Sequence, residues 1–265
     1  MATDGFDELI AAAEEDRFEG WDFSHLSGRL VEAPPPFDYL AAVRGRLPGV
    51  GRLLDLGTGG GEVLSELAPF PVATVATEAW PPNAELAGRR LSALGASVVL
   101  VEGAPENWET LGAPLRAAPA LPFADGAFDL VIDRHESYLP AEVFRVLRPG
   151  GRFVTQQCGG THHADLNVLL GLPRPRYAAW RLDAAEAQLN AVGFVEVIGQ
   201  EAITETRIHD VGAIVYYLKA LPWQAPDFRA RDNLGRLRAL HEQVTRAGPL
   251  TICAHHFLVE AVKPA

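Results

Sequence analysis

The chain has 265 residues, enough for one α/β domain with a buried core. Its 34 acidic and 23 basic side chains give a formal net charge of −11, and two of the basic residues are lysines. This balance counts against a nucleic-acid partner, because binding to a phosphate backbone rests on clustered lysine and arginine. The sequence has no run of 18 apolar residues and opens with an acidic segment unlike a signal peptide, so we expect a cytoplasmic protein with no membrane partner.

Two helices are predicted within the first 50 residues. Residues 7–16 predict an amphipathic helix, three consecutive prolines interrupt the helical pattern at 34–36, and residues 37–47 predict the second helix. Trp21 belongs to an aromatic cluster between the two helices. It either packs on the core or faces a ligand, since large aromatic side chains are mostly buried in both roles.

A strand, a glycine turn and a helix follow in the stretch LLDLGTGGGEVL (53–64). Residues 52–56 predict the strand and 60–67 the helix, and glycines let the turn approach a ligand closely. A dinucleotide-binding turn has a glycine at the third position of its motif, where this chain has Glu62. Together with Asp55 at the strand end, Glu62 favours a cationic ligand over a pyrophosphate.

The second predicted strand, residues 71–77, ends in Glu78. An acid about 20 residues beyond a glycine turn typically binds ribose hydroxyls. The alternative is a solvated acid at the end of a strand, and the neighbouring glycine turn favours the ribose role. A helix at 83–94 and a third strand at 97–101 are predicted next.

The alternation of strands and helices continues to residue 157. The patterns predict a strand at 127–132, a helix at 138–147 and a strand at 152–157. Such alternation is typical of a parallel sheet with helices on both faces.

The last third of the chain is more varied and begins with a loop region at 158–182. The predicted elements that follow are a helix at 183–192 with Asp183 as its N-cap, a strand at 194–203, helices at 209–221 and 229–246, and a final strand at 250–262. No internal repeat or low-complexity linker is visible, so we expect a single domain.

Four segments in order resemble the class I S-adenosylmethionine-dependent methyltransferase family, in particular its type 11-like methyltransferase domain. They are LLDLGTGGG (53–61), Glu78, LPFADGAFDLVIDRHES (121–137) and VLRPGGRFV (146–154). The resemblance implies a Rossmann-like, doubly wound α/β sheet of seven strands, mostly parallel with the last strand antiparallel. It also implies S-adenosyl-L-methionine as the cofactor. The single expected domain, 1–265, then divides into an N-terminal helical lid (1–50), a cofactor-binding core (51–157) and an acceptor side of loops, helices and final strands (158–265).

The resemblance also implies where the cofactor and the acceptor bind. The expected cofactor-binding residues are Asp55, Gly57, Thr58, Gly59, Glu78, Ala79, Gly103, Ala104, Arg134 and His135. Many family members contact the adenine through an acid where this chain has Ala104, so we expect either the backbone at 103–104 or the Asn107 side chain to replace that contact. The expected acceptor-binding residues are Trp21, Tyr138, Gln157, His162 and Tyr216.

His135 is the expected catalytic residue. It follows the fourth predicted strand, on the ligand side of an open α/β sheet, and histidine accepts a proton near neutral pH without a large pKa shift. The alternative is that His135 only shapes the cofactor pocket and that catalysis rests on positioning. Glu136 is the rival base, although a cap on the following helix explains an acid there more readily. His162, His163 and Asp165 invite a metal site, but no further spaced ligand accompanies them, so no metal is expected.

The sequence therefore predicts methyl transfer to a small-molecule acceptor by a monomer or homodimer. The acceptor atom stays open among oxygen, nitrogen, carbon and sulfur. A catalytically silent cofactor-binding protein is one alternative, because no acceptor-site motif is diagnostic. A nicotinamide-dependent oxidoreductase is another, disfavoured by Glu62 and by Tyr216 and Lys219, which are too close together for the Y-x-x-x-K pair of short-chain dehydrogenases.

Overall fold

The computed structural model describes residues 5–18, 22–111 and 120–265, so the expected acceptor residue Trp21 lies outside the described part. The chain forms two compact units. The helical unit comprises Met1–Pro35, Gly160–Ala178 and Ala202–His255, and the sheet unit comprises Pro36–Gly159, Ala179–Glu201 and His256–Ala265.

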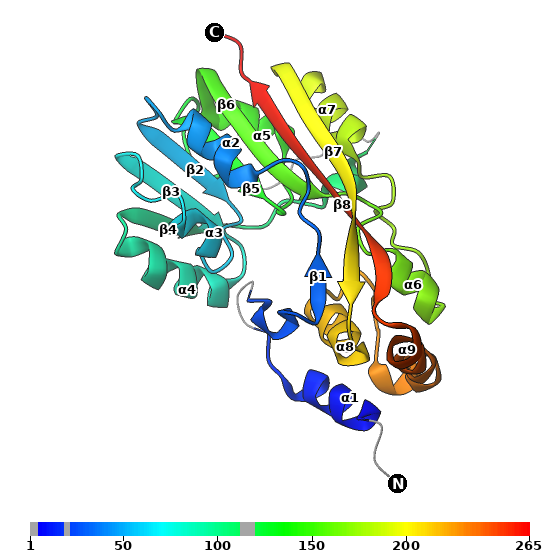
Figure 1. Ribbon diagram of the computed structural model, residues 1–265. Coiled ribbons are helices and arrows are strands. Elements are labelled where there is room, and N and C mark those ends of the chain that lie inside the picture. Colours follow the sequence, from blue (N-terminus) through cyan, green and yellow to red (C-terminus); the bar gives the residue numbers. More distant parts are fainter. Residues whose placement is uncertain (1–4, 19–21, 112–119) are drawn as a thin grey trace. The chain divides into compact units, whose positions relative to one another are not determined.

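Five parallel strands form the frame of the sheet unit (Figure 1). They are β2 (Arg52–Leu56), β3 (Ala73–Glu78), β4 (Ala96–Leu100), β5 (Phe128–Arg134) and β6 (Leu147–Cys158). Hydrogen bonds join them in the order β4-β3-β2-β5-β6, and every pair is parallel. This arrangement confirms the expected doubly wound α/β fold and brings the carboxyl ends of these strands to one edge.

Three further strands complete the hydrogen-bonded order β1-β7-β8-β6-β5-β2-β3-β4. The last strand, β8 (Leu250–Val262), runs antiparallel to β6, as expected. The short β1 (Leu30–Glu32) pairs antiparallel with β7 (Val195–Ile208), which gives eight strands in the described part of the chain where seven were expected. Three residues are too short a segment for an alternating pattern to predict a strand, so β1 is identified by its pairing partner alone.

Helices pack against the strands of the sheet unit. They are α2 (Tyr39–Arg46), α3 (Glu62–Ser65), α4 (Pro81–Ser92), α5 (Pro140–Val146), α7 (Leu182–Ala191) and a 3₁₀ turn, η2, at Asn107–Thr110. Asp38 begins α2, because its carboxylate accepts a hydrogen bond from the Ala41 N–H (3.0 Å). Fully buried side chains such as Val143, Phe153 and Phe257 form one apolar cluster between α5, α7 and the sheet. This close-packed cluster holds the strand ends that carry the site.

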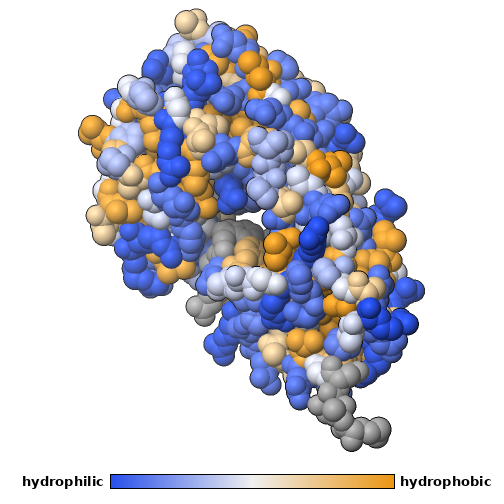
Figure 2. All heavy atoms as spheres, viewed as in Figure 1, coloured by the Kyte–Doolittle hydropathy of each residue, from blue (hydrophilic) through white to orange (hydrophobic). Residues whose placement is uncertain are grey.

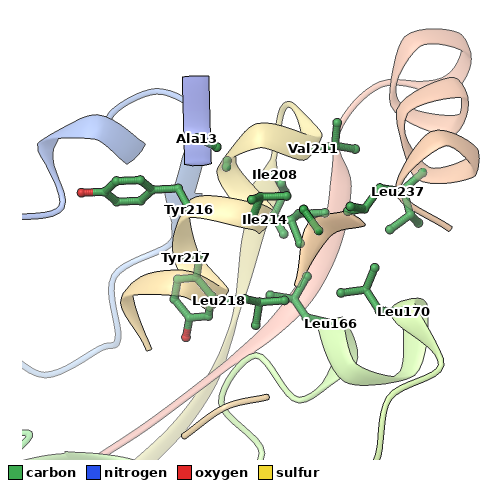
Figure 3. Packing of buried hydrophobic residues seen from close by; sticks show 14 of the residues in the cluster. Ala13, Leu166, Leu170, Ile208, Val211, Ile214, Tyr216, Tyr217, Leu218 and Leu237 are labelled. Carbon is green, nitrogen blue, oxygen red and sulfur yellow. The ribbon is translucent and has the colours of Figure 1, made fainter. Parts of the chain in front are cut away.

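The helical unit is built around α8 (Val211–Ala220), in which every residue except Lys219 is buried. Its other helical elements are α1 (Phe6–Glu15), η1 (Ser24–Leu26), α6 (Asp165–Leu170), η3 (Ala230–Asp232) and α9 (Leu234–Ala247). Figure 3 shows Ile214 and Leu218 of α8 near Leu166 of α6 within this core. Asp210 caps α8 by accepting a hydrogen bond from the Ala213 N–H (2.9 Å).

Some helix ends differ from the expected ones. The helix expected at 60–67 is the short α3, which begins after Gly61 in a left-handed conformation (φ +81°). The helix α7 begins at Leu182, so Asp183 lies in its first turn and is not the N-cap. The Asp183 carboxylate instead accepts a hydrogen bond from the adjacent Ala184 N–H (2.8 Å). The helix expected to begin at residue 229 starts later, because η3 occupies residues 230–232.

The molecular surface mixes polar and apolar residues. Figure 2 shows hydrophilic and hydrophobic residues interspersed on the face in view. Large exposed apolar side chains such as Val72, Trp80 and Ile198 come from separate segments of the chain, which is normal for a globular surface. Within the described residues, none of the helices has both the length and the apolar character needed to cross a bilayer.

Candidate functional site

A pocket lies at the carboxyl ends of β2 and β3 in the sheet unit. Five expected cofactor-binding residues line it, together with Tyr138 from the expected acceptor side: Gly57, Glu78, Ala79, Gly103 and Ala104. Glu102, Glu136 and Glu142 add three further carboxyl groups to the lining. Open α/β sheets bind ligands at this edge, and a lining rich in carboxylates suits a cation.

Glu78 holds the glycine turn in place. Its buried carboxylate accepts a hydrogen bond from the Gly59 N–H through Oε2 (2.7 Å). Its Oε1 accepts hydrogen bonds from the backbone N–H groups of Ala79 (2.9 Å) and Trp80 (2.8 Å). The sequence predicts a ligand contact for Glu78, and the structure adds a second role, because three backbone amides converge on this one carboxylate.

At Gly57 the turn lies against the side chain of Glu136, in the segment beyond β5. Its backbone is left-handed (φ +59°), and a Cβ atom there would overlap the side chain of Glu136. Glycine is therefore required both for its backbone and for its missing side chain. The interpretation of Glu136 as a helix cap is wrong, because α5 begins only at Pro140, with Leu139 at the N-cap.

Two carboxyl groups beside the turn have raised pKa values. Burial raises the pKa of Asp55 to about 7. Repulsion from Glu78 adds to this rise, and the nearby Thr58 side chain opposes it. Burial also raises the pKa of Glu136 to about 7, and repulsion from Glu78 and from Glu106 adds to this effect. Near neutral pH both groups are therefore partly protonated in the ligand-free protein, and a bound cation would favour their ionised forms.

Asp133 and Gln157 brace the end of β5. Asp133 Oδ1 accepts hydrogen bonds from Thr155 Oγ1 (2.8 Å) and from Gln157 Nε2 (2.6 Å). Gln157 Nε2 also donates to the carbonyl of Glu136 (3.0 Å). Burial raises the pKa of Asp133 well above its usual range, although the hydrogen bond from Thr155 opposes this. Gln157, an expected acceptor contact, is thus buried under the site, whereas the expected cofactor contact Arg134 is exposed at the end of β5.

His135 directly follows β5 in a backbone conformation that is uncommon outside glycine, with φ +64°. The His135 N–H donates to the carbonyl of Gln156 (2.8 Å) and so extends the ladder between β5 and β6. Its exposed imidazole stacks on the ring of His256 from β8, with centroids 5.6 Å apart and planes at 24°. The side-chain amide nitrogen of Gln156 lies 3.2 Å from His135 Nε2. Strained residues of this kind concentrate at functional sites.

The loop after β4 provides Gly103 and Ala104 to the pocket. The buried Asn107 side chain, the other expected base contact, donates to the carbonyl of Tyr138 (2.7 Å) and accepts a hydrogen bond from the Tyr138 N–H (3.1 Å). Tyr138 packs edge-on against Phe153, with ring centroids 4.9 Å apart. Asn107 therefore holds the wall of the pocket in place, and the backbone at 103–104 is the better candidate for a contact with a base.

His162 lies in the helical unit, where its ring stacks on that of His163 with centroids 3.8 Å apart. Ring nitrogens of the two histidines lie 3.8 and 3.4 Å from a carboxylate oxygen of Glu32. The Asp165 carboxylate points to another partner and accepts a hydrogen bond from the Cys253 N–H (2.8 Å). The structure thus groups the two histidines with Glu32 and not with Asp165.

Tyr216 also belongs to the helical unit, where it is buried in the apolar core. Its ring stacks on that of His25 with centroids 4.3 Å apart. Figure 3 shows Tyr216 and Tyr217 projecting in different directions from α8. Roles for Tyr216 and His162 at the acceptor remain predictions.

Comparisons with known proteins find similarity to part of the sheet unit. A family model described as a methyltransferase domain matches residues 54–155. The 23S rRNA (guanine(748)-N(1))-methyltransferase of Streptomyces fradiae is 33% identical over 138 residues, which are 50% of this chain and 46% of that protein. Demethylmenaquinone methyltransferase of Thermus thermophilus is 37% identical over 113 residues, 39% of this chain and 45% of that protein. Each match therefore spans less than half of the curated relative.

A solved structure shows the same fold. The YcgJ protein of Bacillus subtilis aligns with a TM-score of 0.56 at 18% identity, over 86% of this chain and 98% of its own.

Proposed function

We propose that this chain, which carries a methyltransferase domain of the class I S-adenosylmethionine-dependent family, transfers a methyl group from S-adenosylmethionine to a small-molecule acceptor. In this proposal residues 1–265 work as one methyltransferase, with a helical lid before the cofactor-binding core and the acceptor side after it.

The observation that carries the proposal is the acidic pocket beside the glycine turn. S-adenosylmethionine has a sulfonium, an ammonium and no phosphate, so carboxylates such as Asp55 and Glu136 attract it. We assign the ribose hydroxyls to Glu78 and the adenine to the backbone at 103–104. The other proposed cofactor contacts are Gly57, Thr58, Gly59, Ala79, Arg134 and His135.

The distribution of positive charge supports a small acceptor. Both lysines are bonded within the chain: Lys219 Nζ donates to the carbonyl of Asp16 (2.6 Å), and Lys263 Nζ donates to that of Leu147 (2.7 Å). Several arginines pair with carboxylates, as Arg46 does with Glu260 (2.7 Å). Phosphate-backbone binding needs clustered basic groups that are not already engaged. Methylation of RNA is the second candidate, favoured by the similarity to the rRNA methyltransferase.

His135 is the catalytic residue of this proposal. Its imidazole takes the acceptor proton while the acceptor atom bonds to the methyl carbon. The carbon–sulfur bond breaks at the same time, and its electron pair passes to sulfur. On the acceptor side, the proposal rests on Tyr138, which lines the same pocket of the sheet unit.

A labelling experiment tests the acceptor class. The protein is incubated with S-adenosylmethionine carrying a tritiated methyl group, once with a metabolite extract and once with purified 23S rRNA. We expect label in the small-molecule fraction and none with the Glu78→Ala variant. Label confined to the RNA would make RNA the acceptor instead. Tight cofactor binding with no transfer to either would favour the catalytically silent alternative.

The affinity for S-adenosylmethionine should rise from about pH 6 to about pH 8. The pKa values of Asp55 and Glu136, raised to about 7, make both groups mostly protonated at the lower pH and mostly ionised at the higher one. Because the cation favours the ionised forms, affinity should rise by about tenfold for each group that must ionise. Calorimetric titration at several pH values measures the affinity. The Glu136→Gln variant should lose the part of the pH dependence that comes from Glu136. S-adenosylhomocysteine, which lacks the sulfonium charge, is the control ligand, and an equal pH dependence for both ligands would contradict the interpretation.

A further inference from the structure

The sheet unit contains a group of three metal-ligand side chains, of which the proposed function uses only His135. His135, Cys158 and His256 each offer one donor atom, and the three atoms lie within 4.8 Å of one another. We propose that these side chains bind a divalent metal ion of the Zn²⁺ type in a site that keeps a fourth coordination position for an exchangeable ligand. The inference does not rest on the proposed function, but a metal ion on His135 would occupy the imidazole lone pair that the proposed base uses.

Strand pairing brings the three donors together. Cys158 of β6 and His256 of β8 are directly opposite in an antiparallel pair, where Cβ atoms lie about 4.5–5.5 Å apart on the same face. Gln156, two residues before Cys158, shares that face and pairs with Arg134 of β5. The chain then passes to His135, whose N–H donates to the carbonyl of Gln156 (2.8 Å). The donors are far apart in the sequence, which is why sequence spacing predicts no metal site.

The donor set is one that Zn²⁺ prefers. Two imidazoles and one thiolate bind zinc at about 2.0–2.1 Å and 2.3 Å, which places donors of a tetrahedral site roughly 3.3–3.7 Å apart. Zinc sites with three protein ligands keep a fourth position for water or substrate. An open fourth position agrees with the burial of the three ligands, because His256 is buried, Cys158 is partly buried and His135 is exposed to solvent.

The surroundings of His135 suit a ligand. Its backbone is held at φ +64°, which fixes where the imidazole leaves the chain. The side-chain amide nitrogen of Gln156 lies 3.2 Å from Nε2 and so contacts the ring. Glu136, the next residue, lines the candidate pocket, so the proposed metal site borders it.

Cobalt titration of the untagged full chain tests the site. After dialysis against a chelator, Co²⁺ is added and the absorption spectrum is recorded, followed by displacement with Zn²⁺. We expect one Co²⁺ per chain, visible bands of a tetrahedral ion and a near-ultraviolet thiolate-to-cobalt band. Cys158→Ser should abolish the near-ultraviolet band. His135→Asn and His256→Asn should each weaken Co²⁺ binding by at least about tenfold.

The chain offers matched controls. Cys253→Ser and His209→Asn change the same residue types in the helical unit and should leave the spectrum unchanged. Circular dichroism and S-adenosylhomocysteine binding show whether each variant is folded. No Co²⁺ binding by the wild type, or a band lost in Cys253→Ser and kept in Cys158→Ser, would overturn the site. A chain that binds S-adenosylhomocysteine but no Co²⁺ would reject the metal site and leave the proposed function standing.

Discussion

Replacing His135 by asparagine is expected to lower kcat for methyl transfer by about 10²–10⁴-fold, the usual range for loss of a general base. Asparagine is the informative substitution, because it tolerates the left-handed backbone found here (φ +64°) but cannot take the acceptor proton. The rate is measured under saturating conditions with the acceptor found by the labelling experiment.

The affinity for S-adenosylhomocysteine separates catalysis from pocket shape. In the His135→Asn variant it should stay within about threefold of the wild-type value, since the substitution keeps the backbone of residue 135, to which we assign the cofactor contact, and the expected loss concerns the reacting atoms. His209→Asn, at an exposed position, controls for the substitution itself. A variant with normal kcat and weakened cofactor binding would make His135 a wall of the pocket, with catalysis by positioning alone.

Replacing Glu78 by alanine is expected to weaken S-adenosylhomocysteine binding by about 10²–10³-fold. A hydrogen bond to a charged group contributes about 1.5–3 kcal/mol, and each 1.4 kcal/mol is a tenfold change in affinity. The variant loses the proposed ribose contact and also the acceptor for the backbone N–H groups of Gly59, Ala79 and Trp80. The effect should therefore exceed that of one ligand contact, and calorimetry measures it directly.

Two comparisons make the Glu78 result specific. Glu85→Ala removes the same charge from an exposed position on α4 and should leave affinity within about twofold. Glu78→Gln keeps one oxygen acceptor and should fall between alanine and the wild type. Wild-type affinity in a folded Glu78→Ala variant would remove Glu78 from the cofactor site.

Local sequence patterns predict much of this fold. The first strand of the core (52–56) and the last strand (250–262) have their predicted bounds, because each is an apolar segment with a clear break on both sides. Glu78 is predictable from its spacing after the glycine turn, and the structure places it at the end of β3 against that turn. These predictions succeed because the residue pattern that determines a strand or a turn is contained in a few neighbouring residues.

Contacts between distant segments are not predictable in this way. The overlap between a Cβ at Gly57 and the Glu136 side chain depends on how two strand ends meet. The hydrogen bond from Gln157 to Asp133 also depends on how distant strands pair. It makes Gln157, an expected acceptor contact, part of the buried support below the site. His256 reaches His135 only through the pairing of β8 with β6. No pattern within one segment carries such information.

The buried acids at the glycine turn have a consequence for folding stability. In an unfolded chain Asp and Glu ionise with pKa values of about 4, whereas burial raises the pKa values of Asp55 and Glu136 to about 7. Between these values the folded, ligand-free protein binds more protons than the unfolded chain. The contribution of these groups to the free energy of unfolding therefore falls as pH rises from about 4 to about 7, and it levels off above that. A cationic cofactor bound at the turn would offset this fall in the free energy of unfolding, because a ligand that binds only the folded protein stabilises it. The amount of folded protein in a cell would therefore follow the supply of the cofactor.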